Sequence, residues 1–485
     1  MKKLIALVLA SLLALGGIAA CNDGDTKDTT AATTAKPTET AVVTESTEME
    51  TGLSGNLEVW SFTNELKTHA VAFRGFNPDV VLDYVEISTD NNEFQNKVIA
   101  SANTDECPDV VGLEAAFVKE FVEAEELLYD LSDLKSLADY LETYQNTIDV
   151  GTDPATGEIR AFSYQTTPGA VFYRRSIALE YFGTEDPEEI QAMMSDMTKF
   201  EEMAATLKEK SGGKVFMVAS VDEFRNAYFS KRDQPWFVDD TLVIDPVIDE
   251  LFEVAKTFRE NGYEAQARQW QEAWFQGMND TLADVDGNPI QIFTFFLPTW
   301  GLPYTLAPNG PDTAGDWGCV TGPLPYQWGG TWVGVMKNAK NPELAKEFVK
   351  FVALNEENLT NWATGVYTNE YLNAIDPELV PLDAEAGISQ AAGDFVSSKK
   401  VVDAITSQFD DSAMSAYLGG QNSYAGFAAA APDVSARLFQ GSDQRVQDIL
   451  TEVINLYAAG EIDKDGAIQN FKDSVASDFP EYIVE

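Results

Sequence analysis

Beyond its N-terminal segment, the chain alternates between two spacings of hydrophobic residues. Residues 56–60 alternate apolar and polar side chains, as a half-buried strand does, and a helical pattern follows over residues 65–76. The succession repeats with alternation over residues 80–87, helical spacing over residues 92–102 and a short apolar strand over residues 108–113. Strands that alternate with helices predict an α/β fold with a largely parallel sheet.

An extended pattern returns over residues 159–173, where the Thr-Thr-Pro-Gly sequence of residues 166–169 interrupts it. We interpret this interruption as a place where the chain crosses from one part of the protein to another. Helical patterns dominate the residues that follow and predict a second, helix-rich part; they cover residues 176–182, 199–210, 246–261 and 264–278.

Near residue 320 the chain is again extended and rich in glycine and proline. Residues 331–336 predict a strand, and Pro342 predicts the start of a helix because proline is favoured at the first helical position. Ala345, Phe348 and Val352 then recur at the spacing of one helix face, which we expect to be buried.

Residues 1–20 have the layout of a secretory signal peptide. Lys2 and Lys3 precede an apolar run over residues 4–15, and small residues then lead to Cys21. Since about 18 consecutive apolar residues are needed to cross a bilayer, this run is too short for a transmembrane anchor. We predict a lipoprotein signal whose removal leaves Cys21 as the acylated residue, so that the protein is tethered to the outer face of a bacterial cell membrane.

Residues 21–54 follow as a stretch rich in Thr, Glu, Asp and Ala, with few large side chains to bury. Such a composition cannot offset the entropy lost on ordering, so we predict a disordered stalk. The remaining residues, 55–485, exceed the usual size of one domain and predict two lobes.

The charge of the chain is strongly negative, at −47 for the whole sequence. Removing residues 1–20 takes away two lysines and no acids, which makes the charge −49. A charge of this sign disfavours nucleic acids and anionic lipid surfaces as partners. With 45% hydrophobic and 11% aromatic residues, the sequence nevertheless has ample material for hydrophobic cores.

The sequence offers few residues for metal binding or histidine-dependent catalysis. Its single histidine, His69, excludes a multi-histidine metal site, and we expect it to be a solvated residue on a helix. Three Asp- and Glu-rich strings lack the full ligand set of a calcium loop and are interpreted as turns. We predict no metal and no cofactor. Cys107 and Cys319 could pair or remain buried thiols.

Aromatic residues beside small polar residues indicate a sugar-binding site. A sugar ring stacks its apolar face on tryptophan, while its hydroxyl groups need carboxylates and amides. Residues of these types follow predicted strands or lie in loops rich in Gly and Pro, and we predict that they bind ligand: Trp60, Asn64, Glu65, Glu114, Gln165, Trp236, Trp300, Trp328 and Trp332. Trp270, Trp274 and Trp362 lie on helical patterns and are assigned to the core.

The sequence of residues 315–352, GDWGCVTGPLPYQWGGTWVGVMKNAKNPELAKEFVKFV, resembles the hinge, strand and helix block of the extracellular solute-binding proteins of family 1. Further blocks agree with this resemblance, among them LEVWSFTNE, CPDVVGLEAAFVKEFV, AVFYRRSIALEYFG and GEIDKDGAIQNFKDSV. Together they cover essentially everything after residue 54. These proteins are the binding components of carbohydrate importers of the ATP-binding-cassette (ABC) class.

The resemblance implies two α/β lobes of the periplasmic-binding-protein type, joined by crossing strands and closing on ligand by a hinge. We expect the first lobe to comprise residues 55–165 and 322–370 and the second to comprise residues 166–321 and 371–485. Residues of the first lobe that match family positions near the sugar are Trp60, Asn64, Glu65 and Glu114, with Trp328 and Trp332 in the segment that re-enters this lobe. Trp300 matches an aromatic residue of the second lobe that stacks on a sugar ring.

The function that follows is capture of a carbohydrate, most simply an oligosaccharide, and its delivery to membrane permease subunits energised by a cytoplasmic ATPase. Such a receptor is expected to be a monomer and not an enzyme. Two alternatives stay open. Aromatic walls with carboxylates such as Glu65 and Glu114 also suit a polyamine or another cationic solute. A glycosidase with two catalytic carboxylates would also have a tryptophan-rich cleft.

Overall fold

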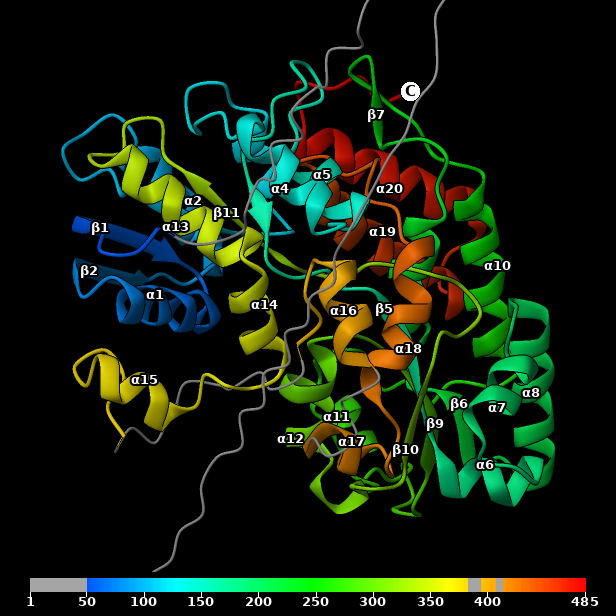
Figure 1. Cartoon of the computed structure of the whole chain (residues 1–485). Coiled ribbons are helices and arrows are strands. Elements are labelled where there is room, and N and C mark those ends of the chain that lie inside the picture. Colours follow the sequence, from blue (N-terminus) through cyan, green and yellow to red (C-terminus); the bar gives the residue numbers. More distant parts are fainter. Residues whose placement is uncertain (1–49, 383–393, 407–412) are drawn as a thin grey trace, which may run out of the picture. The chain divides into compact units, whose positions relative to one another are not determined.

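The computed structural model describes residues 50–382, 394–406 and 413–485 (Figure 1). They belong to one compact unit of the chain, residues 45–485. The predicted signal peptide, the acylation site Cys21 and the predicted stalk up to residue 49 lie outside the described residues. The first strand begins at Ser54, close to where the sequence places the start of the folded part.

The first sheet has five strands in the order β2-β1-β3-β11-β4. Their bounds are β1 Ser54–Ser61, β2 Asp79–Glu86, β3 Val110–Glu114, β4 Phe162–Ser163 and β11 Thr331–Val335. Strands β2 and β3 both pair with β1 in parallel, and β11 pairs antiparallel with β3 and β4. The largely parallel sheet predicted for the first part of the chain is therefore present, with one strand supplied from far along the sequence.

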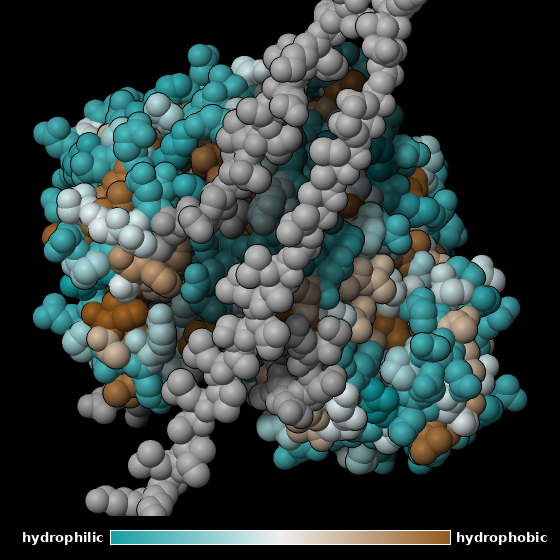
Figure 2. Space-filling view, viewed as in Figure 1, coloured by the Kyte–Doolittle hydropathy of each residue, from teal (hydrophilic) through white to brown (hydrophobic). Residues whose placement is uncertain are grey.

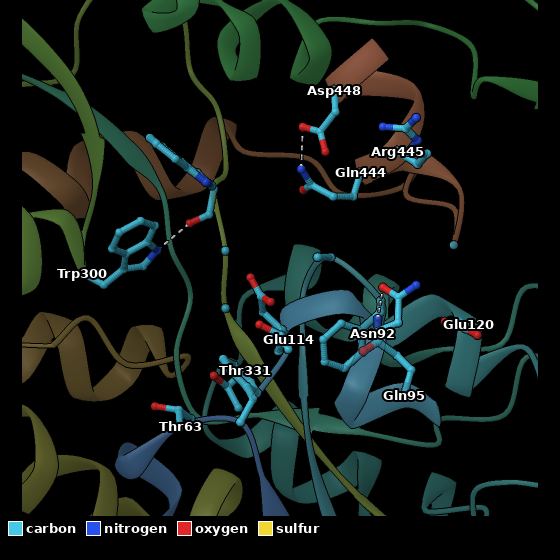
Figure 3. A pocket seen from close by; sticks show the side chains of 18 of the residues that line it. Thr63, Asn92, Gln95, Glu114, Glu120, Trp300, Thr331, Gln444, Arg445 and Asp448 are labelled. Atoms are coloured by element: carbon cyan, nitrogen blue, oxygen red, sulfur yellow. Dashed lines mark hydrogen bonds between the residues drawn. The ribbon is translucent and has the colours of Figure 1, made fainter. Parts of the chain in front are cut away.

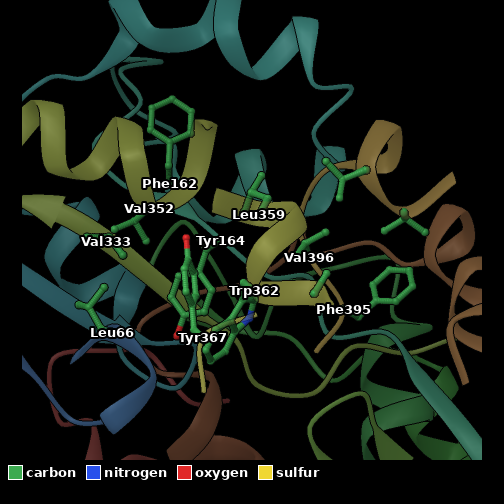
Figure 4. Close-up of a cluster of buried hydrophobic side chains, with 14 of the residues drawn as sticks. Leu66, Phe162, Tyr164, Val333, Val352, Leu359, Trp362, Tyr367, Phe395 and Val396 are labelled. Atoms are coloured by element: carbon green, nitrogen blue, oxygen red, sulfur yellow. The ribbon is translucent and has the colours of Figure 1, made fainter. Parts of the chain in front are cut away.

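Both faces of the first sheet are buried along β3 and β11, as expected for a parallel sheet, whereas the edge strand β2 is largely exposed. Leu57 and Val59 of β1 belong to a large hydrophobic cluster, part of which is drawn in Figure 4. Trp60, the next residue, belongs to a separate cluster with Val111 and Trp332, because successive side chains of a strand point to opposite faces. The helices of this part of the chain are α1 Asn64–Phe76, α2 Glu93–Ser101, α3 Val118–Val122, α4 Lys135–Tyr140, α5 Gln145–Gly151, α13 Pro342–Leu354, α14 Glu356–Ala363 and α15 Asn369–Ile375.

The second sheet has four strands in the order β10-β5-β9-β6. Their bounds are β5 Gly169–Arg174, β6 Val215–Val218, β9 Gln291–Pro298 and β10 Trp317–Val320. β5 pairs antiparallel with β9 and β10, and β6 pairs in parallel with β9. A short ribbon joins β7 Phe237–Val238 to β8 Thr241–Leu242.

Helices surround the second sheet, in agreement with the helix-rich part that the sequence predicts. They are α6 Arg175–Phe182, α7 Pro187–Met193, α8 Met197–Ser211, α9 Arg225–Ser230, α10 Val247–Glu260, α11 Glu272–Met278, α12 Ala307–Asn309, α16 Lys399–Thr406, α17 Ala413–Tyr417, α18 Ser423–Ala430, α19 Asp443–Ala458 and α20 Lys464–Asp478. The predicted helix over residues 264–278 is wrong in its first half. Ala265 N and Ala267 N donate to the carbonyls of Val218 and Ala219, which holds this segment extended beside β6.

Among the residues that the structure describes, three segments connect the two sheets. The first runs from Ser163 at the end of β4 to Gly169 at the start of β5, and confirms the predicted crossing. The second runs from the end of β10 to the start of β11 and touches the first, because Gly169 N donates to Tyr326 O at 2.7 Å. Residues 394–398 form the third, where Thr166 N donates to Phe395 O at 3.1 Å.

The domain boundaries that the sequence suggests remain a prediction. After residue 370 the chain does not leave the first part at once, since α15 packs on α1 and Arg74 forms an ion pair with Asp376.

The structure decides two open questions about side chains, the environment of His69 and the pairing of Cys107 with Cys319. His69 is fully buried between the rings of Tyr164 and Trp362, so the prediction of a solvated histidine is wrong. Cys107 and Cys319 are both buried and, within the described part of the chain, both are free thiols.

The face in Figure 2 is mostly hydrophilic, with hydrophobic residues scattered among polar ones. Among the helices of the described residues, we find none that is long and apolar enough to cross a membrane.

Candidate functional site

A large cavity among the described residues has a volume of about 1390 Å³ and is lined by one edge of the first sheet, by loops and helices beside the second sheet, and by the connections between the sheets. We call it the main pocket. Figure 3 shows its centre, where side chains of α19 face those that follow the strands of the first sheet: Gln444, Arg445 and Asp448 on one side, and Asn92, Gln95 and Glu114 on the other.

The first sheet positions one wall of the main pocket by its topology. Because β1, β2 and β3 run parallel, their carboxyl ends meet at one edge of the sheet, where ligands bind in open α/β sheets. Glu86 ends β2, Glu114 ends β3, and Asn64 with Glu65 starts the helix after β1. The α1 helix begins here because the Thr63 side chain caps it, accepting from Glu65 N at 3.3 Å.

Three tryptophans form an aromatic wall, which we call the tryptophan cluster: Trp270, Trp300 and Trp328. The rings of Trp270 and Trp300 are stacked with centroids 6.3 Å apart, and Trp328 meets both edge-on. Trp300 Nε1 donates to the carbonyl oxygen of Trp328 at 2.9 Å, which ties the loop after β9 to the second connection. Trp270 is 49% exposed, so its ring is available to a ligand.

Glu65 is the most deeply placed carboxyl group of the main pocket. Tyr164 Oη donates to Glu65 Oε2 at 2.7 Å, and the residue is only 8% exposed. The neighbouring Gln165 amide, oriented to satisfy both its ends, donates to Asp394 Oδ2 at 2.8 Å and accepts from Thr331 Oγ1 at 3.1 Å. These bonds join α1 to all three connections between the sheets.

Burial changes the acid strength of this group of carboxyls. It raises the pKa of Glu65, and raises the pKa of Asp394 well above its usual value, with the charge of Glu65 as a further cause. Burial also raises the pKa of Glu114 and of Glu120. These groups therefore hold a proton more readily than carboxyls in water, and a protonated carboxyl can donate as well as accept a hydrogen bond.

The opposite wall carries the positive charge. Arg225 lies with its guanidinium 5.5 Å from the centre of the Trp328 ring and 4.0 Å from Asp448. Arg445 forms an ion pair with Asp478 at 2.5 Å. Among the described residues that line the pocket, these two arginines are outnumbered by six residues with carboxyl groups: Glu65, Glu86, Glu114, Glu120, Asp448 and Asp478. The pocket is thus rich in acceptors, with two fixed cations.

Six of the residues that the sequence singles out line the main pocket, although their contact with a ligand stays a prediction: Asn64, Glu65, Glu114, Gln165, Trp300 and Trp328. Three others do not line it. Trp60 and Trp332 lie within strands and point into the core, where Trp332 Nε1 donates to Thr147 O at 2.8 Å. Trp236 is fully buried against Phe229 and Phe471. For these three the expected place in the cleft is wrong.

Sequence reasoning missed other residues of this site. Trp270 was expected in the core on a helical pattern, but the helix begins only at Glu272, so Trp270 lies in a loop and enters the pocket. The core assignments of Trp274 and Trp362 are confirmed. Arg225, Arg445 and Asp448 gave no sequence signal, because charged residues on helices are usually solvated.

Metal binding has no support in the described ranges. In residues 50–382, 394–406 and 413–485, no three His, Cys, Asp or Glu side chains gather as a metal site requires. The Asp-rich strings form turns and caps; Asp463, for example, caps α20 by accepting from Gly466 N at 2.8 Å.

Solved structures with a similar fold cover nearly the whole described chain. An extracellular solute-binding protein of family 1 matches with a TM-score of 0.67 and 17% identity, over 87% of this chain and 99% of that one. The sugar-binding protein MalE of Xanthomonas citri matches with a TM-score of 0.64 and 14% identity, over 87% and 97%. The galacto-N-biose/lacto-N-biose I-binding protein of a Bifidobacterium longum ABC transporter, solved with lacto-N-biose, matches with a TM-score of 0.61 and 14% identity, over 90% and 100%.

These structures confirm the α/β fold of the periplasmic-binding-protein type. No curated protein matches the sequence. The sequence model of bacterial extracellular solute-binding proteins, however, matches residues 72–376, which is more than half of the chain and includes the second sheet and every strand of the first sheet except β1. By this match, the chain belongs to the family of bacterial extracellular solute-binding proteins.

Proposed function

We propose that the protein captures a carbohydrate in the main pocket and delivers it to the permease of an ABC importer. The observation that carries the proposal is the tryptophan cluster facing buried carboxyl and amide groups. Trp300 supplies an apolar platform, while Glu65 and Gln165 supply hydrogen bonds on the other side. A sugar ring needs both kinds of surface at once.

The size of the pocket and the ligands of similar folds support the same cargo. A volume of about 1390 Å³ exceeds the roughly 300–1,000 Å³ of pockets that bury one drug-sized molecule, which favours an oligosaccharide over a single sugar. Proteins with this fold include ones solved with lacto-N-biose and with β-1,6-galactobiose.

In the proposed mechanism the three connections act as a hinge. A ligand that contacts both walls of the main pocket binds the closed arrangement better than the open one and shifts the population toward it. The permease then recognises the closed form. Lipidation at Cys21 would hold the receptor on the outer face of the membrane beside its permease, with residues 21–54 as a tether.

A cationic solute such as a polyamine is the second candidate. The excess of six carboxyls over two arginines in the described lining favours it. The two candidates differ in salt dependence, since screening weakens the capture of a cation much more than the stacking of a neutral sugar.

Thermal unfolding of the purified protein against a panel of mono- and oligosaccharides, spermidine and putrescine tests the proposal. A ligand at 100 times its dissociation constant stabilises the folded state by about 2.7 kcal/mol, which shifts the midpoint visibly. We expect a shift with one class of sugar, recovered intact. A shift with polyamines alone would replace the proposal by cation capture, and cleavage of a sugar would make the protein an enzyme.

Replacing Trp300 by alanine should weaken sugar binding by about 1–3 kcal/mol, because the platform and its contact area are lost. Calorimetric titration with the sugar that the panel identifies measures this loss. Trp60→Phe is the matched control, since Trp60 is buried outside the pocket and its truncation should leave affinity unchanged. Equal affinities of Trp300→Ala and the unmodified protein would remove Trp300 from the site.

A further inference from the structure

A second cavity, with a volume of about 640 Å³, adjoins the main pocket. We call it the side chamber. Four residues line both cavities: Arg225, Trp270, Arg445 and Asp448. Cavities that share this many wall residues are neighbours, so a ligand that fills the main pocket can extend past these side chains into the chamber.

Two helices form a continuous wall from one cavity to the other. On α19 the lining residues progress from Gln444 in the main pocket to Leu456 in the chamber. On α20 the residue numbers fall from the main pocket to the chamber, from Ser477 in the main pocket to Asn470 in the chamber. At a rise of 1.5 Å per residue, the α19 wall extends about 18 Å. The combined site is therefore elongated.

Trp270 stands at the junction of the two cavities. Its backbone has a φ of +65°, which is uncommon for a large side chain, and such conformations cluster at ligand sites. The ring is held by Trp274, with centroids 5.1 Å apart, and by stacking on Trp300. It still remains 49% exposed. A large ring that is fixed in this way, is half exposed and lines both cavities offers a ligand a hydrophobic contact surface at their junction.

The side chamber is lined by polar groups that are already paired with one another. Arg268 forms ion pairs with Asp222 at 3.0 Å and Glu452 at 2.8 Å, which fixes its orientation. Neutral polar groups, among them Asn470 and Ser474, also line the chamber. The lining holds three arginines against four carboxyls, so its charges nearly cancel. Nearly cancelling charges beside hydroxyl and amide groups suit a neutral polyhydroxylated chain better than a single charged solute.

We propose that the side chamber is a distal subsite, and that the cargo is an oligosaccharide long enough to pass Trp270 and occupy it. This inference rests on the proposed function of the main pocket and adds to it the chain length of the ligand. The chamber then selects longer chains, because only they reach the α19 and α20 wall beyond the junction.

The test is to fill the side chamber without touching the main pocket. Ser474 is exposed on α20 and lines the side chamber but not the main pocket, so Ser474→Trp should block the chamber. Leu456→Trp, on α19, is an independent second variant. Gln469→Trp is the matched control, because Gln469 is exposed on the same helix and lines neither cavity.

Affinities are measured by calorimetry for oligosaccharide series of two to seven units, such as malto-, cello- and xylo-oligosaccharides. We expect affinity of the unmodified protein to rise with length, and the filled variants to lose about tenfold for the long members, which corresponds to about 1.4 kcal/mol. Short members and Gln469→Trp should be unaffected.

Two results would overturn the inference in distinguishable ways. If short and long members bind the filled variants and the unmodified protein alike, the side chamber is not a subsite, although the main pocket still binds sugar. If no member of any series binds the unmodified protein, the proposed function fails and the subsite fails with it.

Discussion

Replacing Gly169 by alanine should destabilise the protein by about 3 kcal/mol or more, at the upper end of what overpacking a core costs. A β-carbon at Gly169 would lie 2.0 Å from Tyr326 Cζ and 2.1–2.3 Å from two further ring atoms. Atoms that are not bonded cannot approach so closely, so either the ring or the backbone must move.

Neither of them can move at low cost. Tyr326 is 1% exposed, and its hydroxyl donates to Ala170 O at 3.0 Å. The backbone of Gly169 is also fixed, because its N–H donates to Tyr326 O at 2.7 Å where the first and second connections meet. The substitution therefore separates two of the three segments that join the sheets.

Urea unfolding of Gly169→Ala measures the loss. Gly441→Ala is the matched control: its added β-carbon would meet only ordinary contacts, the nearest at 3.5 Å from Glu120 N, and should cost little. A double-mutant cycle with Tyr326→Ala isolates the cause, since removing the ring should relieve most of the penalty. If Gly169→Ala costs the same in both backgrounds, the clash with Tyr326 is not its origin.

Lowering the pH should destabilise the protein through its single histidine, by about 3 kcal/mol between pH 6.5 and 4. Burial lowers the pKa of His69 to about 4, against an ordinary value of 6.5. Since the unfolded state binds the proton more readily, this contribution is fully present above pH 6.5 and is lost as the pH falls through 4. Its size follows because a tenfold difference in proton affinity between the folded and unfolded states is worth about 1.4 kcal/mol.

The surroundings of His69 explain the lowered pKa. The ring packs between Tyr164 and Trp362, with centroids 4.7 Å from each, and Nδ1 is paired with the Asn358 amide. Among the described residues Nε2 has no hydrogen-bond partner. A second proton on the imidazole would therefore place a positive charge between aromatic rings, with no acceptor for the hydrogen bond of the added N–H.

Two measurements check this expectation. The imidazole NMR signals, which only one residue can produce, should not shift between pH 7.5 and 5.5. The stability of His69→Phe should also depend less on pH than that of the unmodified protein over pH 6.5 to 4. Imidazole signals that titrate near pH 6.5, or parallel stability curves, would contradict a buried neutral histidine.

The sequence alone determined where strands and helices alternate and where the chain crosses between the sheets. Residues 166–169 and the strand at 331–335 were predictable because turn residues and apolar spacing are local signals. Polar residues after β1 and β3, such as Glu65 and Glu114, were predictable as neighbours because parallel strands end at one edge.

Tertiary structure decided which tryptophans face the pocket. Trp60 and Trp332 belong to strands whose faces are both covered, and periodicity indicates a face but not what covers it. Trp270 entered the pocket because hydrogen bonds to the end of β6 keep residues 265–267 out of a helix.

The charges and the buried histidine also depended on contacts between distant parts of the chain. Arg445 and Asp448 reach the pocket because α19 packs against α9 and α10, which lie far earlier in the sequence. His69 became neutral because Asn358 and Trp362, nearly three hundred residues later, enclose it. A local sequence pattern does not identify such distant neighbours. The burial of these side chains therefore depends on the tertiary structure, and burial in turn decides their charge state and their access to ligand.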